Sequence, residues 1–481
     1  MNHRMKPLPQ TSPRLDCSRR RFLGRGAAWA CACFGACVGA GLGVFGTPAW
    51  AQQPAAPVAT GAEPPRLALL IGNRDYPDGD DLPPIHKNVR DLRAALERRG
   101  FEVFQGLDLD QAQARAATAD FVAKVRAAPA DATVFFYFSG HGAQVDAENL
   151  LVPARISPKA RPDALLRASL TLARDVVDRL PRRPEGLTIA VVDACRTSLR
   201  EMARGEGLNQ VEAPPGCLIA FATGAGKPAI APADDSRNTF YTASLVKMLA
   251  QASDEISFSD LFRLVKYDVQ NTMLNHPVPL LRQFAQFPFI AENTQVRRRL
   301  APLPPPAVAA AASAPARFSN RDEAADWAQL EAALWPAEVE RLAAEFLKNH
   351  VDSRLAGSAQ VAREGAREAM QILRRNDVRL FRSAFQTSDH ANAAELAKAG
   401  RGDKDAAARL ARQYGRDAAR FDSGRYEGWL QYAAALGNGI ASYELALHYR
   451  RVAQPLLAAQ FEARARELGY TPPPSLDNTR K

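Results

Sequence analysis

The sequence predicts an α/β protein, with a mostly parallel sheet covered by helices on both faces, followed by a region built of helices alone. Three observations lead to this. Between residues 66 and 292, apolar runs of strand length alternate with amphipathic helical stretches, the pattern of strands joined by crossover helices. A Pro/Ala-rich stretch at 301–316 then interrupts the alternation. Beyond it, one helical stretch follows another to about residue 470.

The elements of the first region follow from these runs in chain order. The predicted strands are Leu67–Gly72, Phe101–Phe104, Val134–Phe138, Leu187–Val192 and Cys217–Ala222, and the predicted helices are Asn88–Arg99, Gln111–Ala127 and Thr239–Ala250. An isolated helical bundle is the alternative. The aromatic and β-branched run at 134–138 argues against it, because such residues favour strands.

The second region contains a repeated pattern. Gly400, Leu410, Ala411 and Tyr414 recur 35 to 37 residues later as Gly437, Leu445, Ala446 and Tyr449, and a third, incomplete copy begins at Phe461. A repeat of this length is one helix–turn–helix unit that stacks on its neighbours. Residues 395–470 resemble Sel1-like and tetratricopeptide repeats, with a plain helical bundle as the alternative. Such repeats commonly bind a protein partner.

The first 51 residues resemble a twin-arginine signal peptide. Ser18-Arg19-Arg20-Arg21-Phe22-Leu23 precedes an Ala/Gly-rich apolar run that ends in Pro48-Ala49-Trp50-Ala51, a small-x-small cleavage site. A membrane anchor is the alternative, but the run is only weakly apolar. We therefore expect cleavage before Gln52, a periplasmic protein and no membrane span afterwards.

These observations divide the chain into seven parts. They are a signal peptide (1–51), a flexible linker (52–65), an α/β domain (66–292), a Pro/Ala-rich linker (293–318), a helical segment (319–394), helical repeats (395–470) and a disordered tail (471–481).

Charge and cysteine content exclude several functions. The chain carries a formal net charge of +10, but residues 52–481 hold 55 basic and 51 acidic side chains, too balanced for a dedicated nucleic-acid binder. Four of six cysteines precede residue 52, which excludes a disulfide framework or a Cys-rich metal site. No histidine pair has the i, i+4 spacing of a zinc site. Asp78, Asp80 and Asp81 could hold calcium, but a solvated turn is favoured, so we expect no metal and no cofactor.

A histidine and a cysteine mark the candidate site. His141 and Cys195 each follow the carboxyl end of a predicted strand, on loops at the edge where ligands of parallel sheets gather. A cysteine attacks a carbonyl as its thiolate and needs a neighbouring imidazole to exchange protons. The backbone amides of Gly142 and Cys195 could hold the oxyanion, and the glycines flanking His141 would let a substrate approach. Alternatively, Cys195 is a small buried hydrophobe and His141 a structural loop residue.

Residues 66–292 resemble the caspase/metacaspase family of clan CD cysteine peptidases. The resemblance rests on His141-Gly142, on Asp193-Ala194-Cys195-Arg196, and on the segments Ala68–Asn73, Asn149–Pro153, Ala220–Thr223 and Phe240–Leu249. It implies that His141 is the general acid/base, that Cys195 is the nucleophile, and that amide or peptide bonds are hydrolysed without a cofactor.

The substrate preference rests on the same resemblance. Metacaspases use two acidic positions to hold a basic P1 side chain; here one is Asp193, while Asn88 stands at the other. The resemblance therefore implies an Arg or Lys at P1, and self-processing after Arg200 or Arg204. We predict an exported cysteine endopeptidase acting on proteins or peptides. A catalytically idle scaffold that binds partners through its repeats is the alternative.

Overall fold

This computed structural model describes residues 63–145, 148–195, 210–224, 229–300, 322–387, 390–416 and 422–471. The predicted signal peptide, most of both predicted linkers, and the tail beyond Thr471 lie outside these residues. So do the predicted processing positions Arg200 and Arg204.

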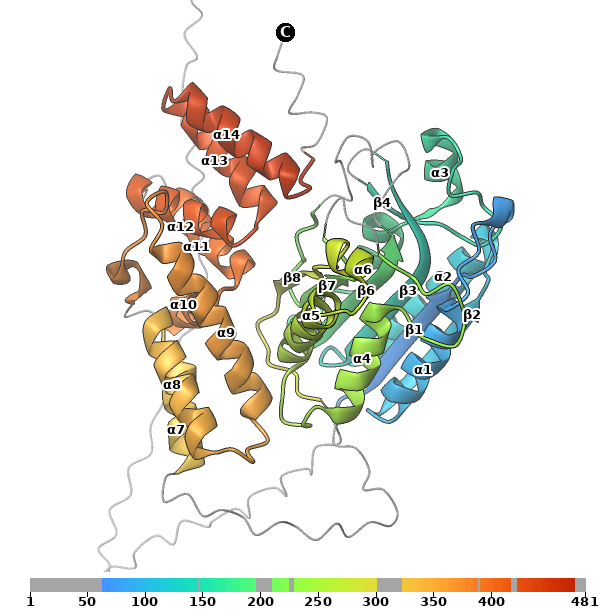
Figure 1. Ribbon diagram of the computed structural model, residues 1–481, viewed down its shortest axis with the longest axis horizontal. Coiled ribbons are helices and arrows are strands. Elements are labelled where there is room, and N and C mark those ends of the chain that lie inside the picture. The colour runs from blue at the N-terminus through green and yellow to red at the C-terminus, as the bar shows by residue number, and fades with distance from the viewer. Residues whose placement is uncertain are drawn as a thin grey trace, which may run out of the picture. The chain divides into compact units, whose positions relative to one another are not determined.

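A mixed, mostly parallel sheet forms the first domain (Figure 1). Its strand order is β2 (Phe101–Leu107), β1 (Arg66–Gly72), β3 (Thr133–Val145), β6 (Leu187–Cys195), β7 (Cys217–Phe221) and β8 (Phe289–Asn293). The first five strands run parallel, and β8 pairs antiparallel with β7. Two short strands, β4 (Glu148–Leu151) and β5 (Leu170–Thr171), extend from the end of β3. The predicted fold class is confirmed.

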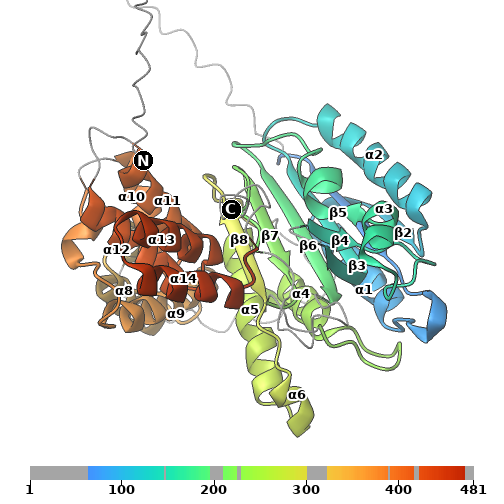
Figure 2. The same cartoon turned by 90° about the horizontal axis from the view of Figure 1, so that it is seen from above.

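Helices cover both faces of the sheet (Figure 2). The helices on one face are α1 (Ile85–Glu97), α4 (Phe240–Gln251) and α5 (Phe258–Leu274); α2 (Gln111–Ala127) lies on the other. Two shorter helices are α3 (Pro162–Ala168) and α6 (Pro279–Gln283). Because side chains alternate along a strand, Phe135 and Tyr137 of β3 enter the first core and Phe136 and Phe138 the second.

The strand that carries the histidine is longer than predicted. We expected β3 to end at Phe138 and His141 to lie in a loop, but the strand continues to Val145. The extension exists because β4 pairs with it antiparallel, from Gly142 opposite Leu151 to Val145 opposite Glu148. Cys195 likewise belongs to β6 rather than to a loop.

Two predicted domain boundaries also need correction. Residues 293–300 were assigned to a linker, but Leu300 is 2% exposed, belongs to the core beneath α5, and donates its N–H to the Ile256 carbonyl at 3.0 Å. The division between the helical segment and the repeats at residue 394 falls inside a continuous helix, His390–Gly400.

The second region consists of packed helices. They are α7 (Glu323–Ala332), α8 (Pro336–Asn349), α9 (Ala356–Leu373), α10 (His390–Gly400), α11 (Lys404–Arg416), α12 (Ser423–Ala435), α13 (Gly439–Arg451) and α14 (Pro455–Glu467). Gly402, Gly437 and Gly469 follow α10, α12 and α14 with φ of +79°, +96° and +79°, a conformation that glycine adopts without strain. Within the described part of the chain, no helix is long and apolar enough to cross a membrane.

Helix α11 covers the edge of the sheet that β8 forms. Lys404 Nζ donates to the Ile290 carbonyl at 2.7 Å, and Arg409 donates to the Glu292 carbonyl at 2.8 Å. The N–H of Glu292 in turn donates to an Asp405 carboxylate oxygen at 2.9 Å. These are backbone groups of β8, the outermost strand. An uncovered edge would offer them to another strand, so α11 protects the sheet against such pairing.

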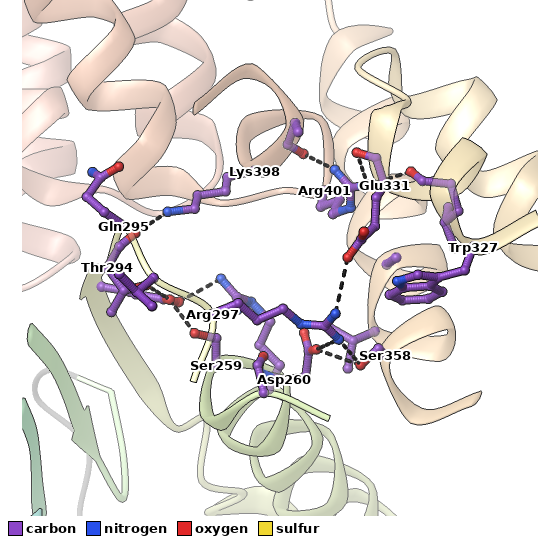
Figure 3. A pocket seen from close by; sticks show the side chains of 18 residues that line it. Ser259, Asp260, Thr294, Gln295, Arg297, Trp327, Glu331, Ser358, Lys398 and Arg401 are labelled. Carbon is purple, nitrogen blue, oxygen red and sulfur yellow. Dashed lines mark hydrogen bonds and ion pairs between the residues drawn. The ribbon is translucent and has the colours of Figure 1, made fainter. Parts of the chain in front are cut away.

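A cavity of about 340 Å³, lined by both charged and apolar side chains, lies between α5, α7, α9 and α10 (Figure 3). Arg297 lies over the Trp327 ring at 5.3 Å and pairs with Glu331 at 3.1 Å. Arg401 donates to the Leu330 carbonyl at 2.6 Å. The charged groups around the cavity thus bind one another and join the helical region to the α/β domain.

Candidate active site

The sheet brings His141 and Cys195 side by side. Their Cα atoms are register partners at the last position where β3 and β6 pair. Neighbouring strands lie about 4.8 Å apart, so the two backbones are directly adjacent. The two residues are 54 positions apart in the chain, and the segment between them contains β4, α3, β5 and most of β6. Only the backbone of Cys195 is described, so its thiol is placed by register alone.

The imidazole of His141 is held by a backbone carbonyl. Its Nε2 lies 2.8 Å from the carbonyl oxygen of Asp80. Its ring meets that of Tyr76 edge to face, with centroids 4.5 Å apart. The Tyr76 hydroxyl also accepts the backbone N–H of His141 at 3.0 Å and donates to the Val152 carbonyl at 3.0 Å. Backbone and ring of His141 are therefore both fixed.

These contacts set the protonation state of His141. Burial lowers its pKa from the ordinary value of 6.5, although the Asp80 carbonyl acts in the opposite direction. The imidazole is therefore neutral at neutral pH. Because a carbonyl only accepts hydrogen bonds, the ring proton belongs on Nε2, and Nδ1 keeps its lone pair. A neutral imidazole with a free lone pair can take a proton from a thiol.

Asp80 acts here through its backbone carbonyl, a role that its residue type does not reveal in the sequence. We considered Asp78, Asp80 and Asp81 only as carboxylates that could bind calcium. Each carboxylate has a protein partner: Ser157 with Asp78 at 3.0 Å, Lys159 with Asp80 at 2.6 Å, and the Tyr76 N–H with Asp81 at 2.7 Å. Among the described residues, no group of three or more His, Cys, Asp or Glu side chains is arranged to hold a metal ion.

One of the glycines beside His141 has a packing role. A Cβ at Gly140 would lie 2.6 Å from the Tyr76 hydroxyl oxygen. The sequence suggested that glycine makes room for substrate, whereas at Gly140 it makes room for the tyrosine that holds His141. Gly142, one of the two predicted oxyanion donors, lies one residue beyond His141, opposite Leu151 of β4. The other predicted donor is the Cys195 amide, at the end of β6.

Asp193 is buried beneath the site. It is 3% exposed, and its Oδ2 accepts hydrogen bonds from Thr239 at 2.5 Å, Thr242 at 2.6 Å and Tyr137 at 3.4 Å. Burial raises the pKa of the Asp193 carboxyl, and the three hydroxyls only partly offset this. Within the described ranges Asp193 forms no ion pair with any Lys, Arg or His, so its negative charge is balanced by hydroxyl dipoles alone.

Asn88 belongs to the same buried network. Its Nδ2 donates to the Ser139 and Thr239 hydroxyl oxygens at 3.3 and 3.2 Å, and its Oδ1 accepts the Thr239 N–H at 3.1 Å. Asn88 is fully buried. The amide thus ties α1 to β3 and to the start of α4, and it reaches Asp193 only through Thr239.

The other cysteine beyond residue 51 lies at the far end of the sheet. Cys217 opens β7 and is the register partner of Thr188, seven residues before Cys195 on β6. At about 3.3 Å per residue the two cysteines are about 23 Å apart along the strands, beyond the roughly 7 Å Cα limit of a disulfide. β6 and β7 are parallel neighbours, so the two cysteines lie at opposite ends of the sheet.

The comparison with known families agrees with this geometry. Residues 65–299 match the caspase domain family. Among solved structures, caspase-1 from Spodoptera frugiperda is similar, with 16% identity, coverage of 49% of this chain and 89% of that chain, and a TM-score of 0.37. No curated protein matches the chain significantly. The family match supports a caspase-like cysteine peptidase and covers every strand of the sheet.

Proposed function

We propose that this protein is a cysteine endopeptidase in which Cys195 is the nucleophile and His141 the general acid/base. The observation that carries the proposal is the register of the sheet. It pairs the backbones of His141 and Cys195, and the Asp80 carbonyl orients the imidazole. The caspase domain match supports the same chemistry.

The proposed reaction has two half-reactions, the formation of a thioester on Cys195 and the hydrolysis of that thioester. The Cys195 thiol gives its proton to Nδ1 of His141, and the thiolate attacks the scissile carbonyl carbon. The amides of Gly142 and Cys195 donate to the resulting oxyanion. The C–N bond then breaks, and the imidazolium protonates the leaving amine. Water, deprotonated by His141, hydrolyses the thioester and restores the thiol.

We further propose that the P1 side chain is Arg or Lys and that Asp193 binds it. The support is the buried carboxylate of Asp193, which has three hydroxyl partners and, among the described residues, no cationic one. A buried charge without a counter-ion is costly, so an incoming guanidinium or ammonium is strongly favoured there. The carboxylate stands two residues before the proposed nucleophile.

Two alanine variants test the catalytic assignment. His141→Ala and Cys195→Ala should each abolish cleavage of Arg-containing peptides, and Cys195→Ala should also abolish covalent capture by an electrophilic peptide. Cys217→Ala is the matched control, because Cys217 is a buried strand cysteine at the opposite end of the sheet. Turnover that persists in Cys195→Ala would contradict the proposal. An unreactive wild-type protein would favour the scaffold instead.

We also propose export to the periplasm through the twin-arginine route, on the strength of Ser18–Leu23 and the apolar run that follows. Replacing Arg19 and Arg20 by Lys should leave the precursor in the cytoplasm, as measured by cell fractionation. Normal export of this double variant would contradict the twin-arginine assignment.

A further inference from the structure

The loop that contacts His141 is itself held by the segment that follows β4. The loop comprises residues 73–84, and the segment comprises residues 152–160. Three contacts join them in the same order along both stretches, the Arg155 N–H to the Asp75 carbonyl at 3.2 Å, the Ser157 hydroxyl to the Asp78 carboxylate at 3.0 Å, and the Lys159 ammonium to the Asp80 carboxylate at 2.6 Å. The position of the loop therefore depends on the segment beside it.

A small apolar cluster, separate from the two main cores of the sheet, lies between the same two stretches. Tyr76 of the loop and Val152 of the segment are buried in it, and Leu82, Ile156 and Ala160 are partly buried against it. Hydrophobic stabilisation is roughly proportional to the apolar area that is buried. Because this cluster is small, the polar contacts contribute a larger share of what holds the loop in place.

The loop turns sharply just before Asp80. Asp78 and Gly79 have φ of +65° and +74°, in the left-handed region that residues other than glycine seldom adopt. Ser157 binds the first of these two residues, and Lys159 binds the residue on which the turn ends. The direction in which the chain leaves this turn decides where the carbonyl of Asp80 points.

Asp80 makes two contacts that matter for the site. Its carboxylate pairs with Lys159 at 2.6 Å, and its carbonyl oxygen lies 2.8 Å from Nε2 of His141. Among the described residues, Lys159 is the only partner of this carboxylate, whose second oxygen, Oδ2, is buried without a hydrogen bond. A largely buried charge without a partner is costly, so the carboxylate would move toward water if Lys159 were removed. Such a movement of Asp80 would carry its carbonyl away from the imidazole.

We propose that Lys159 is a positioning residue for His141 and that it acts through Asp80. The ammonium holds the Asp80 side chain, and the carbonyl of Asp80 then holds the imidazole with its proton on Nε2. This inference rests on the proposed peptidase function, in which Nδ1 of His141 accepts the thiol proton. A ring without the Asp80 carbonyl can carry its proton on either nitrogen, and the form protonated on Nδ1 cannot act as that base.

Lys159→Met tests the proposal, with Lys247→Met as the matched control. Methionine keeps an unbranched apolar side chain but carries no charge. Lys247 pairs with Asp268 at 2.7 Å, and these side chains are 48% and 19% exposed, against 46% and 18% for Lys159 and Asp80. The control pair joins α4 to α5 instead of the two stretches beside His141.

The first readout is the kinetics of the full-length protein on a short Arg peptide. Lys159→Met should lower kcat about three- to fivefold, the factor that a well-placed but partly exposed ion pair supplies. KM should change by less than about twofold, because the proposed role is to position the base and not to bind substrate. Lys247→Met should keep the wild-type kcat. Lys159→Arg keeps the positive charge and should retain at least about half of the wild-type kcat.

A double-mutant cycle asks whether Lys159 acts through Asp80. Asp80→Asn removes the charge that Lys159 binds but keeps the backbone carbonyl, and it should lower kcat by a similar factor. Adding Lys159→Met to Asp80→Asn should cause no further loss, because residues that act as one unit are not additive. Losses that multiply would refute the action through Asp80. If Lys159→Met fails to fold, Asp80→Asn carries the same readouts.

The tautomer of His141 gives a second readout that does not depend on activity. Nitrogen NMR of isotope-labelled histidine rings is recorded at about pH 8, where a histidine of ordinary pKa is neutral, with His141→Ala to assign the signal. Wild-type protein and Lys247→Met should show the His141 proton on Nε2. In Lys159→Met, part of the His141 signal should shift to the tautomer protonated on Nδ1.

The outcomes separate this proposal from the peptidase assignment. If wild-type protein cleaves no peptide, the peptidase assignment fails, while a changed tautomer in Lys159→Met would still support the link from Lys159 to His141. If kcat and the tautomer are both unchanged in Lys159→Met, the proposal is refuted. A lower kcat with an unchanged tautomer, or an equal loss in Lys247→Met, also refutes it, because the effect would then be one of general stability.

Discussion

Replacement of Asp193 by Asn removes one negative charge from the base of the site and little else. The two side chains have the same shape, and the hydroxyls of Thr239, Thr242 and Tyr137 can still donate to the amide oxygen. The variant therefore separates the charge of Asp193 from its packing.

The magnitude of the effect on specificity follows from the burial of this carboxylate. Removing one partner of a buried, hydrogen-bonded charge pair costs about 2–5 kcal/mol. If the P1 guanidinium pairs with Asp193, kcat/KM for an Arg peptide should fall by about 30- to 4,000-fold, at roughly tenfold per 1.4 kcal/mol. A peptide with citrulline at P1 keeps the shape but lacks the charge, so its kcat/KM should change by less than about threefold.

The same substitution should stabilise the fold at neutral pH. Burial raises the pKa of Asp193 above its ordinary value of 3.8, so ionisation favours the unfolded chain. Asn lacks this penalty and should raise the melting temperature at pH 7. The advantage should shrink as the pH falls through the raised pKa, because the wild-type carboxyl is then protonated.

Peptide kinetics with the Arg and citrulline pair, and thermal melts across pH, measure both effects. Equal losses of kcat/KM for the two peptides would refute the charge pair. An unchanged kcat/KM for the Arg peptide would also refute it. A variant that melts below the wild type at pH 7 would contradict the view of Asp193 as a carboxylate stabilised only by hydroxyl dipoles.

Three further predictions concern the cysteines, the histidine and the chain segment between β6 and β7. On the acidic side of the pH profile, the midpoint of kcat/KM should lie below pH 6.5, because burial lowers the pKa of His141 and the neutral ring is the base. A midpoint above pH 6.5 would contradict this. Purified protein should be cut after Arg200 or Arg204, and Cys195→Ala should stay whole; terminal sequencing that finds cuts only after aspartate would rule out a basic P1. Cys195 and Cys217 should remain unpaired under oxidising conditions, so a disulfide-linked peptide in non-reducing mass spectrometry would overturn the sheet order.

The sequence alone determines the elements whose signals are local. The run at 134–138 is aromatic and β-branched, and that composition suffices to predict a strand. The five predicted strands and three predicted helices are present in the structure, and their prediction follows from the same alternation of apolar runs. His141 and Cys195 could be selected because each directly follows such a run, and the register then places their backbones side by side.

The tertiary structure alone decides what depends on backbone groups and on distant pairing. β3 extends to Val145 only because β4 folds back against it. The carbonyl of Asp80 orients His141, and the carbonyls of Gly437 and Gly469 hold Gln210. Every residue carries the same C=O group, so no residue type marks these acceptors in a sequence. Their roles come from where the chain brings them, up to 259 positions away from the partner in the case of Gly469.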